Sequence, residues 1–120
     1  MYEIYEGTKK VYLVLEYLKG GELLSYINSS DHYSEEIAQK IMKYLLNALA
    51  YCHELGIVHR DIKPENLIFM YELTRNSKDE DFNLKIIDFG ISAILTKEKC
   101  LTQKYGTAGY IGLLKSSRNS

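Results

Sequence analysis

The sequence predicts an α+β fold, and three observations support this prediction. Short apolar runs of strand length are separated by turns, one long stretch carries apolar residues at helical spacing, and a polar loop has apolar residues on both sides. The chain has 120 residues, so we expect at most one small domain. Its composition, with 46% hydrophobic and 26% charged residues, is that of a globular chain and not of a disordered one.

Charge and cysteine content argue against several classes of protein. The formal net charge is −1, which gives no basic surplus for nucleic acid. No apolar stretch approaches the length of a membrane span, and residues 1–6 lack the apolar run of a signal peptide. Cys52 and Cys100 lie far apart without a C-x-x-C partner, so zinc and disulfide sites are both disfavoured. We expect a soluble, cytoplasmic protein without a nucleic-acid or membrane partner; its oligomeric state stays open.

The first part of the chain has the pattern of a β-hairpin followed by a short helix. Residues 1–6 and 11–17 are predicted strands, joined by a turn at 7–10 that contains glycine. Residues 22–29 are predicted to form the short helix, which polar residues then end.

A long helix is predicted next. Ser34 is a suitable N-cap, and two acids follow it in the first turn, where the helix dipole favours negative charge. Gly56 suits the position just beyond the C-terminus. The apolar face is wide, so we expect packing partners on more than one side. Its residues are Ile37, Ala38, Ile41, Met42, Leu45, Ala48, Leu49 and Cys52.

Three further apolar runs, at 56–58, 67–69 and 84–87, are predicted strands. The stretch 70–83 between the last two is polar and charged, and we predict a solvated loop without chemistry there.

The polar loop between the first two of these strands carries the groups from which we infer chemistry. The Asp61 carboxylate can orient a hydroxyl and receive its proton, and the Lys63 ammonium can neutralise a phosphate. The Asn66 amide oxygen can hold a divalent cation. Pro64 fixes φ and stiffens the loop between them. The alternative interpretation is a chance polar turn between two core strands.

A family resemblance favours the chemical interpretation. Residues 59–66 read His-Arg-Asp-Ile-Lys-Pro-Glu-Asn and resemble the catalytic loop of eukaryotic protein kinases, and residues 86–90 resemble the strand that ends in Asp-Phe-Gly in the same family. The resemblance implies a partial kinase fold, with short small-lobe strands, a hinge, and the first helices and catalytic-loop strands of the large lobe. It also implies that His59 and Phe89 link the two motifs.

The resemblance assigns roles to the polar residues. It implies transfer of the ATP γ-phosphoryl group to a protein hydroxyl. Asp61 would orient the acceptor and take its proton, and Lys63 would stabilise the transferring group. Asn66 and Asp88 would hold Mg²⁺. The implied cofactors and partners are ATP, Mg²⁺ and a protein substrate.

Residues 18–21 resemble the kinase hinge. By that alignment the Glu16 carbonyl and the Leu18 amide contact adenine, Leu15 is the gatekeeper behind them, and Glu22 contacts ribose or substrate. The alternative is a plain hairpin followed by a Gly-Gly turn.

Residues 104–111 resemble the Gly-Thr-x-x-Tyr end of an activation segment. Together with Lys63 this favours serine or threonine as the acceptor, with a likeness to calcium-dependent and calcium/calmodulin-dependent kinases. Arg60 suggests pairing with a phosphate, for which Thr102 is the first candidate acceptor and Thr96 the second. The alternative is that both are unmodified hydroxyls.

The resemblance divides the chain. Residues 1–111 are a predicted partial kinase domain, and 112–120 are a polar tail outside the family pattern, with Gly-Leu-Leu-Lys in place of Ala-Pro-Glu. The domain subdivides into small-lobe strands (1–17), hinge (18–21) and the start of the large lobe (22–111).

The glycine-rich loop and the strand lysine of kinases have no match in the sequence. We therefore expect a fragment that is inactive alone, and the alternative function is a catalytically incompetent or pseudokinase-like binding protein. Each unpaired large side chain on the long helix forgoes about 1.5–3 kcal/mol, against a total stability of about 5–15 kcal/mol. The isolated chain is expected to be marginal or unfolded.

Overall fold

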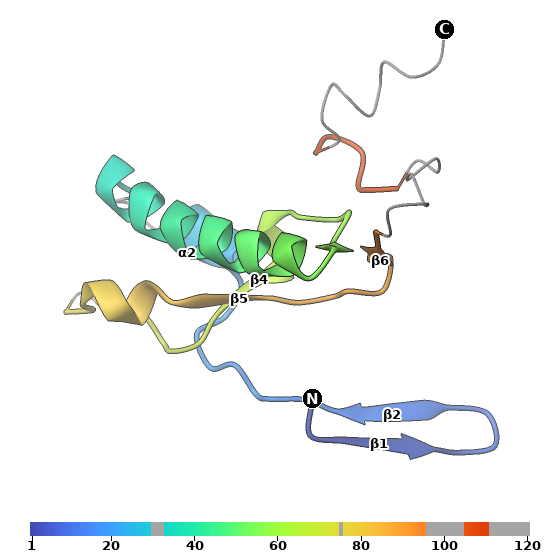
Figure 1. The fold of residues 1–120 in the computed structure, drawn as a ribbon. Coiled ribbons are helices and arrows are strands. Elements are labelled where there is room, and N and C mark those ends of the chain that lie inside the picture. Colours follow the sequence, from blue (N-terminus) through green and yellow to red (C-terminus); the bar gives the residue numbers. More distant parts are fainter. Residues whose placement is uncertain (30–32, 75, 96–104, 111–120) are drawn as a thin grey trace, which may run out of the picture.

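The computed structural model describes residues 1–29, 33–74, 76–95 and 105–110, and within them it confirms an α+β arrangement (Figure 1). Predictions for Thr96, Cys100, Thr102 and residues 112–120 lie outside these ranges. The elements in chain order are β1 (Glu3–Glu6), β2 (Val11–Val14), α1 (Leu23–Ser29), α2 (Glu35–Glu54), β3 (Ile57–Val58), η1 (Pro64–Asn66), β4 (Leu67–Phe69), η2 (Asp79–Phe82), β5 (Leu84–Ile86) and β6 (Ala93–Ile94).

The strands pair in three separate antiparallel couples. They are β1 with β2, β3 with β6, and β4 with β5. In the last pair Leu67 faces Ile86 and Phe69 faces Leu84. This pairing places β4, which follows the polar loop, beside β5, which leads to Asp88. The two predicted motifs are therefore brought together.

The β1–β2 hairpin lies apart from the other elements, and a single extended segment connects it to them (Figure 1). Its register pairs Glu3 with Val14 and Glu6 with Val11, and all eight strand residues are exposed. The predicted second strand was three residues too long, because the ladder ends at Val14 and the chain then turns toward the rest of the molecule.

Two glycines allow the connecting segment to lie against β4. The Gly20 amide donates to the Phe69 carbonyl at 3.1 Å, and the Phe69 amide donates to the Gly21 carbonyl at 3.0 Å. A β-carbon on Gly20 would lie only 2.4 Å from the Phe69 β-carbon. Gly21 has a φ of +76°, which a side chain would strain. The Gly-Gly pair therefore fixes where the chain enters α1.

The long helix begins and ends as the sequence predicted. The Ile37 amide donates to the Ser34 hydroxyl at 3.3 Å, and Glu35 and Glu36 occupy the first turn. At the other end Gly56 has a φ of +72°, and its amide donates to the His53 carbonyl at 2.9 Å. The helix is thus directed straight into β3 and the polar loop.

The core lies between α2, α1 and the β4–β5 pair. α2 packs along β5 and η2, and Ile41 and Leu45 are its buried residues. Ile37, Leu49 and Cys52 are half-buried, whereas Met42 and Leu46 are exposed. Among the described residues, no helix is long and apolar enough to cross a membrane. The buried apolar residues are Leu23, Ile41, Leu45, Leu67, Phe69, Phe82 and Leu84.

The prediction that residues 70–83 form only a solvated loop was wrong. The segment contains the 3₁₀ helix η2, and Phe82 at its end is 7% exposed and belongs to the core. The Lys40 ammonium on α2 lies 5.7 Å from the centroid of the Phe82 ring. Phe82 thus packs in the core, and η2 contacts α2 although most of the segment is polar.

Replacing Phe82 by alanine is expected to lower the free energy of unfolding by about 3–5 kcal/mol, because a buried aromatic ring is lost and a cavity remains. The matched control is Tyr71→Ala in the same stretch, where the side chain is 54% exposed and the expected change is within about 0.5 kcal/mol. Urea titration in sucrose, which strengthens burial, measures both. Equal stability of the two variants would place Phe82 in solvent and contradict the structure.

Candidate active site

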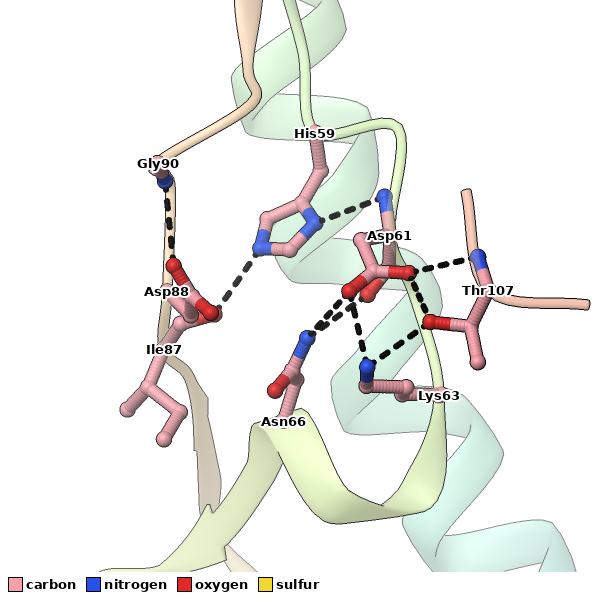
Figure 2. Close-up of polar contacts among 8 residues, drawn as sticks. All are labelled: His59, Asp61, Lys63, Asn66, Ile87, Asp88, Gly90 and Thr107. Atoms are coloured by element: carbon pink, nitrogen blue, oxygen red, sulfur yellow. Dashed lines mark hydrogen bonds and ion pairs between the residues drawn. The ribbon is translucent and has the colours of Figure 1, made fainter. Parts of the chain in front are cut away.

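The polar loop between β3 and β4 is organised around a buried imidazole. His59 is 2% exposed. Its Nδ1 accepts the Asp61 amide at 3.2 Å, and its Nε2 donates to the Ile87 carbonyl at 2.9 Å (Figure 2). The ring also meets the Phe89 ring edge-on, with centroids 4.6 Å apart. The predicted link of His59 and Phe89 between the two motifs is confirmed.

Two residues without the freedom of glycine have positive φ in the described part of the chain. Arg60 has a φ of 73° and Asp88 a φ of 59°. Each such conformation costs roughly 1–3 kcal/mol and persists only where surrounding contacts hold it. Arg60 directly follows His59, and Asp88 directly follows Ile87, whose carbonyl accepts the His59 hydrogen bond. The strained backbone therefore lies within the two predicted motifs.

The Asp61 carboxylate is the centre of a four-residue polar cluster. One oxygen accepts the Thr107 amide at 3.0 Å and the Thr107 hydroxyl at 2.6 Å. The other oxygen lies 2.9 Å from the Lys63 ammonium and 3.2 Å from the Asn66 amide nitrogen. Lys63 also donates to the Thr107 hydroxyl at 2.8 Å, which closes the cluster (Figure 2).

These contacts change the acidity of both charged groups. The hydrogen bond from Thr107, followed by that from Lys63, lowers the pKa of Asp61 from its ordinary value of 3.8 to about 2. The hydrogen bond to Asp61 raises the pKa of Lys63. At neutral pH the cluster therefore contains a carboxylate and an ammonium with a hydroxyl between them.

Thr107 is the site residue that the sequence analysis did not assign. It lies 46 positions from Asp61, and no spacing rule connects two residues so far apart. The available signal was the Gly-Thr-x-x-Tyr element, which was used only to predict the acceptor class.

Asn66 and Asp88 present oxygen atoms suited to a hard cation. The Asn66 nitrogen donates to the Asp61 carbonyl at 2.9 Å, so its amide oxygen points away from Asp61 (Figure 2). The Asp88 carboxylate accepts the Gly90 amide at 3.1 Å. The Asn66 carbonyl accepts the Ile87 amide at 2.9 Å and so ties the two residues' segments together.

The donor set fits Mg²⁺ better than a metal held by protein alone. Among the described residues, no group of three or more His, Cys, Asp and Glu side chains could hold a metal ion. Mg²⁺ is commonly bound through one or two protein oxygens, with water and substrate phosphates completing its shell. Asn66 and Asp88 would supply that number of ligands.

The residues predicted around a hinge lie on the connecting segment. The Glu16 carboxylate forms an ion pair with Lys85 on β5, the strand that leads to Asp88. Leu18 is half-buried, and Glu22 forms an isolated backbone bridge with Ile68. Their assigned contacts with ATP stay predictions.

Leu15, the predicted gatekeeper, is 58% exposed. In the described structure it therefore does not lie behind a closed pocket, and its role also stays a prediction.

Fold and site together define a protein kinase domain, with the catalytic-loop and Asp-Phe-Gly motifs joined through one histidine. The chain belongs to the protein kinase domain family, whose model matches residues 1–112. The predicted resemblance is therefore confirmed.

Curated relatives include calcium-dependent and related kinases. The chain is 44% identical over 107 residues to calcium-dependent protein kinase 12 of Arabidopsis thaliana, covering 89% of the chain and 21% of that protein. It is 42% identical over 111 residues to calcium/calmodulin-dependent serine/threonine-protein kinase 1 of Oryza sativa subsp. japonica, covering 92% and 18%. With the maternal embryonic leucine zipper kinase of Danio rerio it shares 47% identity over 93 residues, covering 78% and 12%. The chain thus spans about a fifth or less of these proteins.

Replacing Thr107 by valine is expected to raise the pKa of Asp61 from about 2 toward 3.8, because the hydroxyl that stabilises the carboxylate is removed. A depressed pKa adds stability that is fully present above pH 3.8 and is lost as pH falls toward 2, so in the variant this contribution is smaller and its loss is complete at a higher pH. Carbon-13 NMR titration of the Asp61 carboxyl measures the change.

Thr74→Val is the matched control, because the Thr74 side chain is exposed and contacts only its own turn among the described residues. It is expected to leave Asp61 unchanged. An Asp61 titration that is the same in the Thr107 variant and in the unmodified chain would contradict the cluster.

Proposed function

We propose that the protein containing this chain is an ATP-dependent serine/threonine protein kinase. The observation that carries the proposal is the position of one hydroxyl, that of Thr107, within 2.6 Å of the Asp61 carboxylate and 2.8 Å of the Lys63 ammonium. An acceptor serine or threonine needs the same two partners. The names of the relatives, which include serine/threonine kinases, support the same class.

The two charged residues would act on different atoms. Asp61 would orient the acceptor hydroxyl and receive its proton as the hydroxyl oxygen bonds to the γ-phosphorus and the bond from that phosphorus to the ADP oxygen breaks. With a pKa of about 2 it is a weak base, so orientation is the larger part of its role. Lys63, fixed by Asp61 at 2.9 Å, balances negative charge on the phosphoryl group during transfer.

The remaining roles concern ATP and its metal. Asn66 and Asp88 would hold Mg²⁺, which when bound neutralises charge on the phosphate oxygens. The Glu16 carbonyl and the Leu18 amide would contact adenine, and Glu22 would contact ribose or substrate. The other partner is a protein with a serine or threonine acceptor.

The proposal keeps the predicted division of the chain. Residues 1–17 belong to the small lobe, 18–21 to the hinge and 22–111 to the start of the large lobe, followed by a tail at 112–120. A cytoplasmic location stays a prediction.

Asp61→Asn in the complete protein is expected to lower kcat about 10²–10⁴-fold, because an amide neither orients the acceptor hydroxyl as the carboxylate does nor receives its proton. Transfer of labelled phosphate from ATP to a peptide measures it. Glu72→Gln, a change at an exposed carboxylate, is the matched control and should keep full activity. An Asp61 variant with undiminished kcat would overturn the assignment.

The second candidate is a non-catalytic, kinase-derived binding protein. The observation that favours it is the hairpin predicted to belong to the small lobe, which is exposed throughout, with Leu15 beside it also exposed. Magnesium-dependent ATP binding separates the two candidates. Calorimetry that gives millimolar or absent affinity favours the binding protein, and tighter affinity that requires Mg²⁺ favours the kinase.

A further inference from the structure

Arg60 and Tyr105 form a second contact beside the Asp61 cluster. The guanidinium carbon of Arg60 lies 3.8 Å from the centroid of the Tyr105 ring, which is a close cation–π distance. Arg60 precedes Asp61, and Tyr105 lies two residues before Thr107. The same two segments are therefore joined twice, once through a ring and a guanidinium and once through a carboxylate and a hydroxyl.

Arg60 is held from another direction as well. Its Nε donates to the Ile91 carbonyl, and one terminal nitrogen donates to the Ser92 carbonyl at 3.3 Å. A guanidinium can donate from its edge while an aromatic ring covers its face. Arg60 thus connects the polar loop, the turn after Phe89 and the segment at 105–107.

We infer that Tyr105 is a positioning residue, whose ring on the Arg60 guanidinium keeps the Thr107 segment against the polar loop. The Thr107 amide and hydroxyl both reach one oxygen of Asp61, at 3.0 and 2.6 Å. Such short bonds weaken steeply with displacement. A second contact two residues away restricts that displacement.

The stack also bears on how this segment is anchored. From the sequence, a phosphate on Thr102 or Thr96 was a candidate partner of Arg60, with unmodified hydroxyls as the alternative. The Tyr105 ring is a partner of Arg60 that needs no modification. The Ile91 and Ser92 carbonyls accept hydrogen bonds from guanidinium nitrogens that would be needed to bind a phosphate. The Tyr105 contact therefore holds residues 105–107 in the unphosphorylated chain.

The importance of this contact for catalysis rests on the proposed function, but the contact itself does not. The test is accordingly structural and uses the complete protein that contains this chain. NMR measures two quantities: nuclear Overhauser effects between the Arg60 side-chain NεH and the Tyr105 ring, and the exchange rate of the Thr107 amide.

The unmodified chain is expected to show the Overhauser effect, and Tyr105→Phe, which keeps the ring, is expected to retain it with unchanged Thr107 exchange. Tyr105→Leu removes the π face and is expected to raise the Thr107 amide exchange rate roughly two- to fivefold. This is the fold-change that corresponds to the free energy of an exposed cation–π contact. Tyr110→Leu, at an exposed tyrosine of the same segment, is the matched control and should leave that rate unchanged.

Three outcomes would overturn the inference. They are the absence of the Overhauser effect in the unmodified chain, equal Thr107 exchange in the Tyr105→Leu and Tyr105→Phe variants, and an equal rise in the Tyr110→Leu control. None of these outcomes depends on a kinase assay. If the proposed function proved wrong, the inference about Tyr105 would still be decided by the NMR measurements.

Discussion

The buried imidazole of His59 is the constraint on which the rest of the site depends. It binds the Asp61 amide on one side and the Ile87 carbonyl on the other, so the residues on either side of it cannot move independently. A backbone bond from Ile87 to the Asn66 carbonyl completes the frame. A ring with both nitrogens satisfied inside a protein is hard to displace, since each broken bond would leave a buried polar atom unpaired. His59 therefore fixes the polar loop and the Asp-Phe-Gly turn relative to each other.

From this frame two layers of contact reach residues 105–107. Asp61 and Lys63 converge on the Thr107 hydroxyl, and Arg60 stacks on the Tyr105 ring. The frame also reaches the connecting segment, where Lys85 on β5 pairs with Glu16. Exposed ion pairs contribute little stability, so the larger restraint on that segment is the close backbone approach at Gly20 to Phe69.

Local features of the fold could be predicted from the sequence because neighbouring residues determine them. The Ser34 cap, the glycine at 56 and the strands around the polar loop depend on chemistry within a few positions. Thr107 and Phe82 could not be assigned, because their roles depend on partners 46 and 42 positions away, Asp61 and Lys40. The family resemblance supplied the roles of Asp61 and Asn66, whereas it supplied nothing for Tyr105, where the structure alone places the ring against Arg60.

We propose that Asn66 and Asp88 together hold Mg²⁺ at the edge of a phosphoryl-transfer site. Paramagnetic broadening by Mn²⁺, used as a probe for Mg²⁺, tests it most directly when recorded with and without ATP. We expect Mn²⁺ with ATP to broaden the Asn66 side-chain amide and the Phe89 backbone amide, and Asp88→Asn to remove the effect. Broadening confined to exposed acids such as Glu35 and Glu36, or unchanged by Asp88→Asn, would contradict it.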